Sequence, residues 1–584
     1  MEWNLKLIYE TEELFNKDFE SLEDDLKKIE ALRGKLNTKE ALIEYAKIDR
    51  AFESKLEKVW NYAHMNRDLN QKDLNSSKRF QMVYSKYLDI ISRTSFINPE
   101  LLKNNFIDVM NWCNDKELKP AKFLFEKLFR NNKHFKNTKI EEIMSRYNQS
   151  TNGYSQLYDD LLVGDGKSVD VLLNDGTTIT VDSANYTYYL GTLKLQDDRR
   201  RVFEAYYQVY EDHKKTLASI YKGVIAGEFA DSKNRGYKTI LDSHLFGNSI
   251  DKKVYTSLIS VARNNNQPVR KYYSLKKKYL GLKHIYTYDR MIKFSESKVK
   301  YSYDEAKRLV LEADKSLGDD FYNKACKVLG DGRVSVMPRD GKTTGAYSTG
   351  TYENGAFILL NHTNDLNSAF TIAHEAGHSI HTLYANEAQP YETHDYTIFV
   401  AEVASTFNEA RFNDYMMEHI TDKNERIVLL QEQIEGLIAT FYRQTLFADY
   451  ELQAHTIYEQ GGVIDEEVLS NIMIDLYKKY YGYDLHKEEL KKYVWAYIPH
   501  MFHTPFYVYQ YATSYAASQA IYQNVKNNVP GAFDSYINLL KSGGSDYPVN
   551  LLKKAGVDLT TKEPFMAVVN KLDELVNKLE EELK

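Results

Sequence analysis

Glycine and proline are scarce along this chain. The 584 residues include 27 glycines and 10 prolines, smaller shares than the roughly 7% and 5% of an average protein. These two residue types end helices and form the turns between strands. Their scarcity favours long helices over many short strands. We therefore expect a mainly α fold and exclude collagen-like, low-complexity and turn-rich β architectures.

Apolar residues at helical spacing support this expectation. The residues Phe15, Phe19, Leu22, Leu26 and Ile29 follow one another at steps of four and three positions, which places them on one face of a helix. Comparable patterns recur up to about residue 162 and from residue 186 onward. The carboxyl-terminal sequence KLDELVNKLEEELK predicts an amphipathic helix whose charges face solvent.

Two irregular zones interrupt the helical patterns. In the first, Asn174-Asp175-Gly176 separates two β-branched runs, which predicts a β-hairpin within residues 163–182. We place a domain boundary near this hairpin. It separates an amino-terminal helical lobe, residues 1–185, from a catalytic domain, residues 186–584.

The second irregular zone covers residues 332–362. Val334–Met337 and Ala356–Leu360 are apolar runs that predict strands. The glycine-rich stretch between them predicts a mobile loop.

Charge and cysteine content exclude several classes of protein. The net charge is −7, which gives no electrostatic reason to expect a nucleic-acid partner. Cys113 and Cys326 are the only cysteines, too few for a disulfide framework, and they fit a reducing cytoplasm. We find neither a signal peptide nor a run of 18 apolar residues. We therefore expect a cytoplasmic protein without a membrane partner.

The strongest chemical signal is the motif His374-Glu375-Ala376-Gly377-His378, an H-E-x-x-H pattern within a proline-free helical sequence. Two histidines four residues apart project from one face of a helix about one turn apart, where both can bind one Zn²⁺. Glu375 is rotated by about 100° from His374 and can act as general base on a water molecule. The alternative, a surface helix with two unrelated histidines, explains less of the pattern.

Two neighbouring residues add to this interpretation. Gly377 lies inside the predicted helix, where glycine costs about 1 kcal/mol relative to alanine. A second helix packed closely against it would explain its presence. His381 follows on the same stripe, and we favour a packing or orienting role for it over direct metal binding.

The third metal ligand must come from elsewhere in the chain. An extended motif with a third histidine fails, because His381 stands at its glycine position and Tyr384 at its final histidine position. A carboxylate is therefore expected. The downstream candidates are Glu387, Glu392, Glu402 and Glu409.

Of these candidates we favour Glu402. It lies among Ala401, Ala404 and Ser405, small residues that allow close packing against the helix of Gly377. Glu409, seven residues on and on the same face, is either an ordinary surface residue or a group that orients a ligand.

A second candidate segment follows His503. Thr504 is a good helix N-cap and Pro505 fits the first helical position, so we expect a helix to begin there with His503 just before it. The segment contains four tyrosines within nine residues, at positions 507, 509, 511 and 515. In such a helix Tyr509 points away from the other three. The tyrosines form either a set of donors to an oxyanion or a packing stripe.

The combination of motifs resembles the oligoendopeptidase F branch of the thimet-oligopeptidase-like zinc metallopeptidases. HEAGHSIH followed by AEVASTFNEA carries the resemblance, together with GKTTGAYSTGTY, AFILLNH and HTPFYVYQYATSYAAS. GLKHIYTYD and DGTTITVD match weaker patterns, so the resemblance covers nearly the whole chain. Lys342-Thr343-Thr344 departs from the Lys-Arg-Ser that is common in this branch. This departure affects the expected details of the loop and leaves the expected metal site unchanged.

The resemblance implies two helical lobes around a deep substrate channel, with a small β-sheet next to the zinc-binding helix. It implies cleavage of short unstructured peptides at internal bonds. It also favours a catalytic role for His503, Tyr507 and Tyr511. On physical grounds, the edge of the Ala356–Leu360 strand could pair with an extended substrate.

We therefore predict a zinc endopeptidase that acts on oligopeptides. One Zn²⁺ is held by His374, His378 and Glu402, and Glu375 is the general base. The alternatives are a helical zinc carboxypeptidase and a peptide-binding protein without catalysis. Glu375 argues against the second, because binding alone needs no general base. The sequence contains no signal for the oligomeric state.

Overall fold

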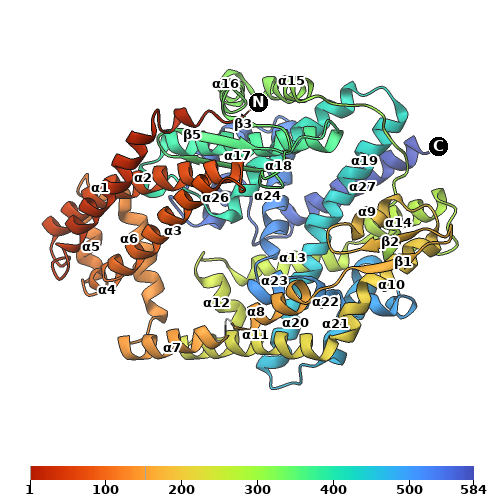
Figure 1. Ribbon diagram of the computed structural model, residues 1–584, viewed down its shortest axis with the longest axis horizontal. Coiled ribbons are helices and arrows are strands. Elements are labelled where there is room, and N and C mark those ends of the chain that lie inside the picture. Colours follow the sequence, from red (N-terminus) through yellow and green to blue (C-terminus); the bar gives the residue numbers. More distant parts are fainter. Residues whose placement is uncertain (1, 152) are drawn as a thin grey trace. The chain divides into compact units, whose positions relative to one another are not determined.

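The computed structural model describes residues 2–151 and 153–584. Helices dominate these residues, and two small sheets accompany them (Figure 1). The predicted mainly α fold is therefore confirmed. None of the described helices combines the length and the apolar character that a membrane crossing requires. Both cysteines are free thiols.

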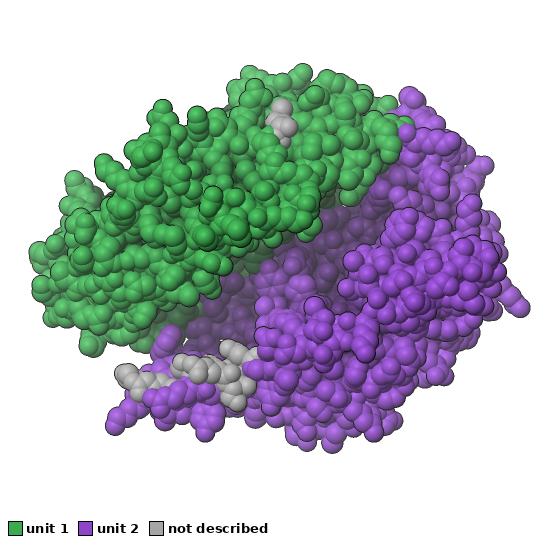
Figure 2. Space-filling model, in the orientation of Figure 1, with its two compact units in different colours: residues 1–133, 299–419, 518–557 green, residues 134–298, 420–517, 558–584 purple. Residues whose placement is uncertain are grey.

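The chain divides into two compact units, which Figure 2 shows in green and purple. Unit 1 comprises residues 1–133, 299–419 and 518–557, and unit 2 comprises residues 134–298, 420–517 and 558–584. Each unit draws on three separate stretches of the chain. This division does not test the linear boundary near residue 185. That boundary and the substrate channel both stay predictions.

Unit 1 consists of helices and a three-stranded sheet. Its helices are α1 (Glu12–Glu30), α2 (Lys39–Leu69), α3 (Leu74–Thr94), α4 (Ile97–Leu101), α5 (Phe106–Trp112), α6 (Lys122–Asn131), α15 (Tyr303–Asp314), α16 (Asp319–Val328), α17 (Leu366–Ala388), α18 (Ile398–His419), α25 (Ala532–Lys541) and α26 (Pro548–Lys554). Its strands are β3 (Val334–Ser335), β4 (Tyr347–Thr351) and β5 (Gly355–Leu359).

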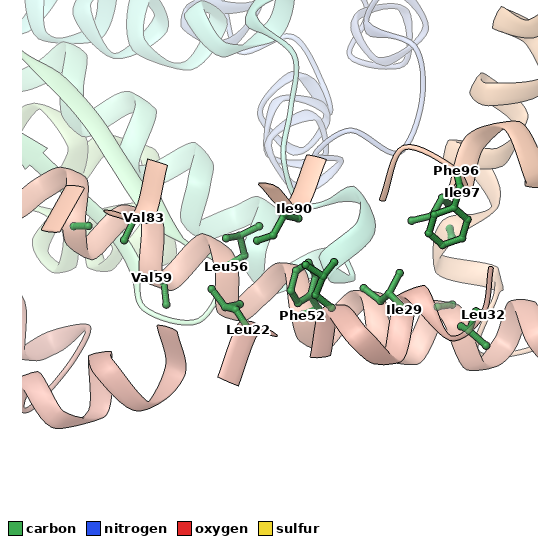
Figure 3. Packing of buried hydrophobic residues seen from close by; sticks show 14 of the residues in the cluster. Leu22, Ile29, Leu32, Phe52, Leu56, Val59, Val83, Ile90, Phe96 and Ile97 are labelled. Atoms are coloured by element: carbon green, nitrogen blue, oxygen red, sulfur yellow. The ribbon is translucent and has the colours of Figure 1, made fainter. Parts of the chain in front are cut away.

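The amino-terminal helices pack through the apolar face that the sequence predicts. Thr11 caps α1 by accepting a hydrogen bond from the Leu14 backbone N–H, which satisfies one of the free donors at a helix start. Leu22 and Ile29 of α1 lie in one buried cluster with apolar residues of α2 and α3 (Figure 3). Burial of each such side chain contributes about 1.5–3 kcal/mol.

The sheet connects this cluster to the helix that carries the H-E-x-x-H motif. Phe357 and Leu359 of β5 belong to the same buried cluster as α1–α3. Successive side chains of a strand point to opposite faces, and β5 also contacts α17. The cluster and α17 therefore hold β5 between them.

The strand order β3-β5-β4 corrects two expectations. The glycine-rich stretch predicted as a loop contains β4, which pairs antiparallel with β5. Tyr347 fixes the start of β4, because its ring packs on Trp3 and its hydroxyl donates to Asp68 at 2.7 Å. Since β5 lies between two strands, it has no free edge for a substrate. Among the described strands of this sheet, the edges belong to β3 and β4.

Unit 2 is also helical and holds a two-stranded hairpin. Its helices are α7 (Thr138–Thr151), α8 (Gly153–Asp159), α9 (Tyr186–Thr192), α10 (Gln196–Asp212), α11 (Lys214–Arg235), α12 (Ile240–Phe246), α13 (Lys252–Asn264), α14 (Gln267–Tyr279), α19 (Lys423–Leu437), α20 (Gln444–Glu459), α21 (Glu466–Tyr481), α22 (Val494–Tyr497), α23 (His500–His503) and α27 (Glu563–Glu582). Helix α24 (Tyr509–Lys526) begins in unit 2 and ends in unit 1.

The hairpin confirms the turn signal in the sequence. Strand β1 (Val169–Leu172) pairs antiparallel with β2 (Thr178–Val181). Gly176 adopts a φ of +86° in the connecting turn, a conformation that glycine reaches without a steric penalty. The amphipathic carboxyl-terminal helix is also confirmed, as α27.

Candidate metal centre

Helix α17 carries both histidines of the H-E-x-x-H motif. Asp365 caps the start of this helix by accepting a hydrogen bond from the Ser368 backbone N–H at 2.8 Å. His374 and His378 lie one turn apart, and their Nε2 atoms are 3.2 Å from each other. The helical spacing in the sequence therefore brings two imidazole nitrogens together.

Helix α18 supplies a carboxylate to the same place. Glu402 Oε2 lies 3.6 Å from the Nε2 atoms of both His374 and His378. One potential ligand atom from each of the three residues lies within 4.8 Å of the other two, and in the described part of the chain they are the one such histidine, cysteine and acidic group. Two imidazole nitrogens and one carboxylate oxygen form a donor set that suits a catalytic zinc ion.

The close approach of the two helices depends on Gly377. A Cβ atom at this position would lie 2.6 Å from the Ala404 carbonyl oxygen and 2.8 Å from the Ser405 Cα. Such distances are too short for a side chain. Gly377 thus allows α18 to bring Glu402 to the two histidines, as its place inside a helix predicts.

Polar neighbours orient the predicted ligands. Nδ1 of His374 donates to Glu409 Oε1 at 2.5 Å, which leaves Nε2 as the metal-facing nitrogen. The Ser405 hydroxyl donates to Glu402 Oε2 at 2.9 Å. Of the two interpretations of Glu409, the contact supports the one in which it orients a ligand.

Glu375 lies next to this group and is 5% exposed. Its Oε2 atom is buried and has no hydrogen-bond partner among the described residues. Burial is the main cause that raises the pKa of Glu375 to about 7; Glu402 and Glu409 also raise it, whereas the charge of His374 and a hydrogen bond with the Ser348 backbone lower it. A carboxylate with a pKa near neutrality can accept and release a proton.

The two imidazoles differ in their affinity for a proton. Burial lowers the pKa of His374, but the hydrogen bond and charge of Glu409 outweigh it and raise the pKa to about 9. Burial and the charge of His374 lower the pKa of His378 to about 4.

His381 does not join the metal-binding group. It is 1% exposed, and its ring stacks on Tyr396 with 3.6 Å between the ring centroids. The Tyr396 hydroxyl donates to the His378 carbonyl oxygen at 3.3 Å and contacts the Thr382 hydroxyl at 2.9 Å. This packing role agrees with the interpretation favoured from the sequence. No motif in the sequence identifies Tyr396 as a neighbour of the metal centre.

The other two acidic candidates are engaged elsewhere. Glu387 forms an ion pair with Lys324 at 2.7 Å, and Glu392 forms one with Arg50 at 2.7 Å. Of the acidic residues considered from the sequence, the structure brings Glu402 next to the two histidines.

The His503 segment differs from its prediction. Thr504 does not cap a helix that begins at Pro505: the short helix α23 ends at His503, and α24 begins at Tyr509. The intervening turn contains Phe506 with a φ of +56°. A bulky residue rarely adopts this conformation. Local propensity therefore predicts a helix that runs on from Pro505, which the structure does not have.

The tyrosines of this segment nevertheless separate as predicted. The rings of Tyr507 and Tyr511 contact each other with centroids 5.6 Å apart, and each also contacts His500, at 6.1 and 6.3 Å. Tyr509 is 3% exposed and packs against Tyr255 instead. His503 is partly exposed, and its Nε2 lies 3.0 Å from Asp159 Oδ1.

His500 is a residue that the sequence argument missed. It lies ahead of Pro505, outside the helix that we expect to begin there. Its spacing of three residues from His503 is the signal that could have identified it, because such a spacing places both on one side of a helix. His500, His503, Tyr507 and Tyr511 all belong to unit 2, whereas the predicted metal ligands and Glu375 belong to unit 1.

Comparison with known proteins gives a consistent result over the whole chain. Residues 192–570 match the model of peptidase family M3, and residues 100–167 match the model named oligopeptidase F. An oligoendopeptidase F homologue from Borreliella burgdorferi is 32% identical and covers 97% of this chain and 96% of its own length. Oligopeptidase PepF from Bacillus subtilis is 31% identical, covering 99% of this chain and 87% of its own.

Solved structures share the fold. One from Chlamydophila abortus has a TM-score of 0.92 and 29% identity, covering 99% of this chain and 98% of its own. The oligoendopeptidase F structure from Enterococcus faecium has a TM-score of 0.74 and 25% identity, covering 98% and 99%. The fold and the family resemblance inferred from the motifs are thus supported along the entire chain.

Proposed function

Because the chain belongs to peptidase family M3, and is therefore a metallopeptidase, we propose that it is a zinc-dependent endopeptidase of short, unstructured oligopeptides. The observation that carries the proposal is the convergence of His374, His378 and Glu402 beside the buried Glu375. The names of the relatives from Borreliella burgdorferi and Bacillus subtilis support oligopeptides as the substrate class.

The donor set fits the metal that the family implies. His374 and His378 would bind zinc through Nε2, and Glu402 through a carboxylate oxygen. Three protein ligands are typical of catalytic zinc sites, which keep one position open, whereas structural sites have four. When bound, the ion supplies a Lewis acid that polarises the scissile carbonyl and lowers the pKa of water.

The chain's own residues move the proton and hold the ligands. Glu375 takes a proton from the attacking water at a carboxylate oxygen and delivers it to the leaving amine. Burial raises the pKa of its carboxylate, which favours acceptance of the proton. Glu409 keeps His374 in the tautomer with a free Nε2, and Ser405 fixes one oxygen of Glu402.

Strand β4 provides a surface for the substrate backbone. It is an edge strand of its sheet. The backbone of Ser348, a residue of this strand, forms a hydrogen bond with Glu375. An extended peptide that adds to this edge would place its main chain next to the general base. Main-chain hydrogen bonds give affinity without requiring a particular sequence.

We retain His503, Tyr507 and Tyr511 as proposed donors to the negative charge that develops on the carbonyl oxygen. Phenolic hydroxyls and imidazole N–H groups can make such hydrogen bonds. The resemblance to the oligoendopeptidase F branch carries this part of the proposal.

Digestion of a graded peptide library tests the function, with products identified by mass spectrometry. Internal cleavage of peptides with amidated carboxyl termini supports an endopeptidase. A carboxypeptidase would release single residues from free carboxyl termini and spare the amidated peptides. A binding protein would leave all peptides intact. Loss of cleavage after chelation, with recovery on zinc addition, would establish the metal requirement.

A further inference from the structure

A cluster of four buried polar residues lies within unit 2, next to the turn that precedes Tyr507. Its members are Tyr221, Tyr450, Glu451 and His455, of which the first two are 0% exposed and the last two 1% exposed. The ring of Tyr221 lies 6.3 Å from that of Tyr450 and 6.2 Å from that of His455. Each residue has one buried polar atom without a partner among the described residues, namely Tyr221 Oη, Tyr450 Oη, Glu451 Oε2 and His455 Nε2. Buried groups of this kind are rare and call for a reason.

The turn beside this cluster is strained at Phe506. Its φ of +56° is unfavourable for a bulky side chain, and such a conformation persists only where the surroundings enforce it. The Phe506 ring is 3% exposed and packs on His455 with centroids 4.6 Å apart. Ring packing therefore holds one side of the turn.

Glu451 holds the backbone of the same turn. Its Oε1 atom accepts a hydrogen bond from the Phe506 N–H at 2.8 Å. Pro505, the preceding residue, has no N–H to contribute. A buried N–H without an acceptor is strongly disfavoured, so the orientation of this peptide group depends on Glu451.

We propose that Glu451 is a positioning residue, which locks the Phe506 turn through this hydrogen bond and thereby fixes Tyr507 and Tyr511 beside His500. The inference rests on the proposed function, because it takes these tyrosines to act in catalysis. Tyr507 follows the strained residue directly, and the ring contacts among Tyr507, Tyr511 and His500 require the chain to leave the turn in one direction.

The lock depends on the length of the Glu451 side chain and not on its charge. Burial raises the pKa of Glu451 to about 8, although the Phe506 N–H lowers it. Burial thus favours the neutral acid, which glutamine imitates in size and in its acceptor oxygen. Aspartate keeps the acid but is one methylene shorter, so it withdraws the acceptor from the Phe506 N–H.

These two substitutions form a matched pair for the test. Glu451→Gln and Glu451→Asp are compared with the unaltered chain, and Tyr450→Phe serves as a control that deletes an unpaired hydroxyl of the cluster without touching the turn. Hydrogen–deuterium exchange of fragments covering residues 504–509 reports the lock directly. Steady-state kinetics on an internally quenched peptide reports its consequence, and zinc content is measured for every variant.

We expect Glu451→Asp to speed exchange in this fragment and to lower kcat by about 10- to 100-fold, since small misplacements have effects of this size. KM and zinc content should change less than twofold. Glu451→Gln and Tyr450→Phe should match the unaltered chain in all readouts. Both Glu451 variants change the same buried residue. A general loss of folding would therefore affect both, whereas a positioning role affects only Glu451→Asp.

Three results would overturn the proposal. Unchanged exchange in Glu451→Asp would show that the hydrogen bond does not hold the turn. A loss in Glu451→Gln as large as that in Glu451→Asp would show that the acid group itself is required, so that reach alone does not explain the effect. Faster exchange with normal kcat would also contradict it. After that last result, Tyr507→Phe and Tyr511→Phe decide which part of the proposal fails. If both variants have normal kcat, the tyrosines have no catalytic role. If either variant has a lower kcat, the tyrosines are catalytic and Glu451 does not position them.

Discussion

The helix pair α17–α18 in unit 1 and the segment from His500 to Tyr511 in unit 2 carry reactive side chains on different kinds of backbone. The first consists of two regular helices of 23 and 22 residues. The second consists of a four-residue helix, a strained turn and the start of α24. In the first region helical spacing sets the geometry, whereas in the second a buried hydrogen bond and ring packing do.

This difference determines which changes should harm each region. The metal centre of unit 1 should be harmed by substitution of residues at the contact between α17 and α18. These residues include Glu375, Glu409 and the small residue Gly377. The segment of unit 2 should be sensitive to its hydroxyl groups and to the lock at Phe506.

Glu375→Gln should have the largest effect. Removing the general base is expected to lower kcat by about 10²–10⁴-fold. Zinc content should stay unchanged, because Glu375 is not one of the three ligand candidates. Kinetics and metal analysis on the same preparation measure both. A variant with near-normal kcat would remove Glu375 from the proposed mechanism.

In unit 2, Tyr507→Phe or Tyr511→Phe should lower kcat by about 10²–10³-fold, the usual effect of losing one oxyanion donor. His503→Ala is expected to act in the same direction. KM should change less than kcat, because these donors act mainly in the transition state. Tyr509→Phe is the matched control, since Tyr509 packs against Tyr255. Normal kcat in both phenylalanine variants would make the tyrosines a packing stripe.

Glu409→Ala should weaken metal binding by about 10- to 100-fold, as expected for a group that orients a histidine ligand. Its hydrogen bond to His374 is lost, while the three ligand candidates remain. Competition with a chelator measures the affinity. Glu418→Ala, which changes an exposed residue of the same helix, should leave the affinity unchanged. Equal affinities for the two variants would contradict the orienting role.

Gly377→Ala tests the closeness of α17 and α18. The added methyl group would lie 2.6 Å from the Ala404 carbonyl oxygen, and overpacking of this kind costs about 1–3 kcal/mol. Gly436→Ala is the control in α19, where an added Cβ meets nothing within 4 Å. It should be neutral or stabilising by up to about 1 kcal/mol. Thermal melting compares the two, and similar melting temperatures would argue against a tight helix contact.

The smallest effect on activity is expected for a buried acid of unit 1, which bears on stability. Asp314 is 1% exposed, and burial raises its pKa to about 8, although Arg411 and Asn408 lower it. The stability that its bound proton provides is present below about pH 4, the unfolded pKa, and is lost as the pH rises to about 8. Asp314→Asn should therefore melt at a higher temperature than the unaltered chain, by a margin that grows from pH 5 to pH 8. A margin that is independent of pH would contradict this assignment.

The two regions also differ in how far the sequence predicts them. His374, His378 and Glu375 are related by helical spacing alone, and the small residues around Glu402 indicate a helix that can approach Gly377. These rules survive in the structure because they depend on helical spacing and on residue size, which can be read from the sequence itself. The turn of β1 and β2 is predictable for the same reason, since Asn174-Asp175-Gly176 favours it locally.

Where the prediction fails, contacts between distant residues decide the outcome. Strand β4 forms in a glycine-rich stretch because Tyr347 packs on Trp3 and binds Asp68. The helix expected from Thr504 is interrupted because Glu451, more than fifty residues earlier, holds the Phe506 N–H. Neither partner can be identified from the local pattern, and His500 was missed along with the turn.

The proposed metal centre holds one catalytic zinc ion through His374, His378 and Glu402. Zinc titration into metal-free protein, with peptide hydrolysis as the readout, tests it most directly. Activity should rise in proportion to added zinc and reach its plateau at one ion per chain, while Glu402→Ala should remain inactive over the same range. Full activity without metal, or recovery of Glu402→Ala at the same stoichiometry, would contradict the claim.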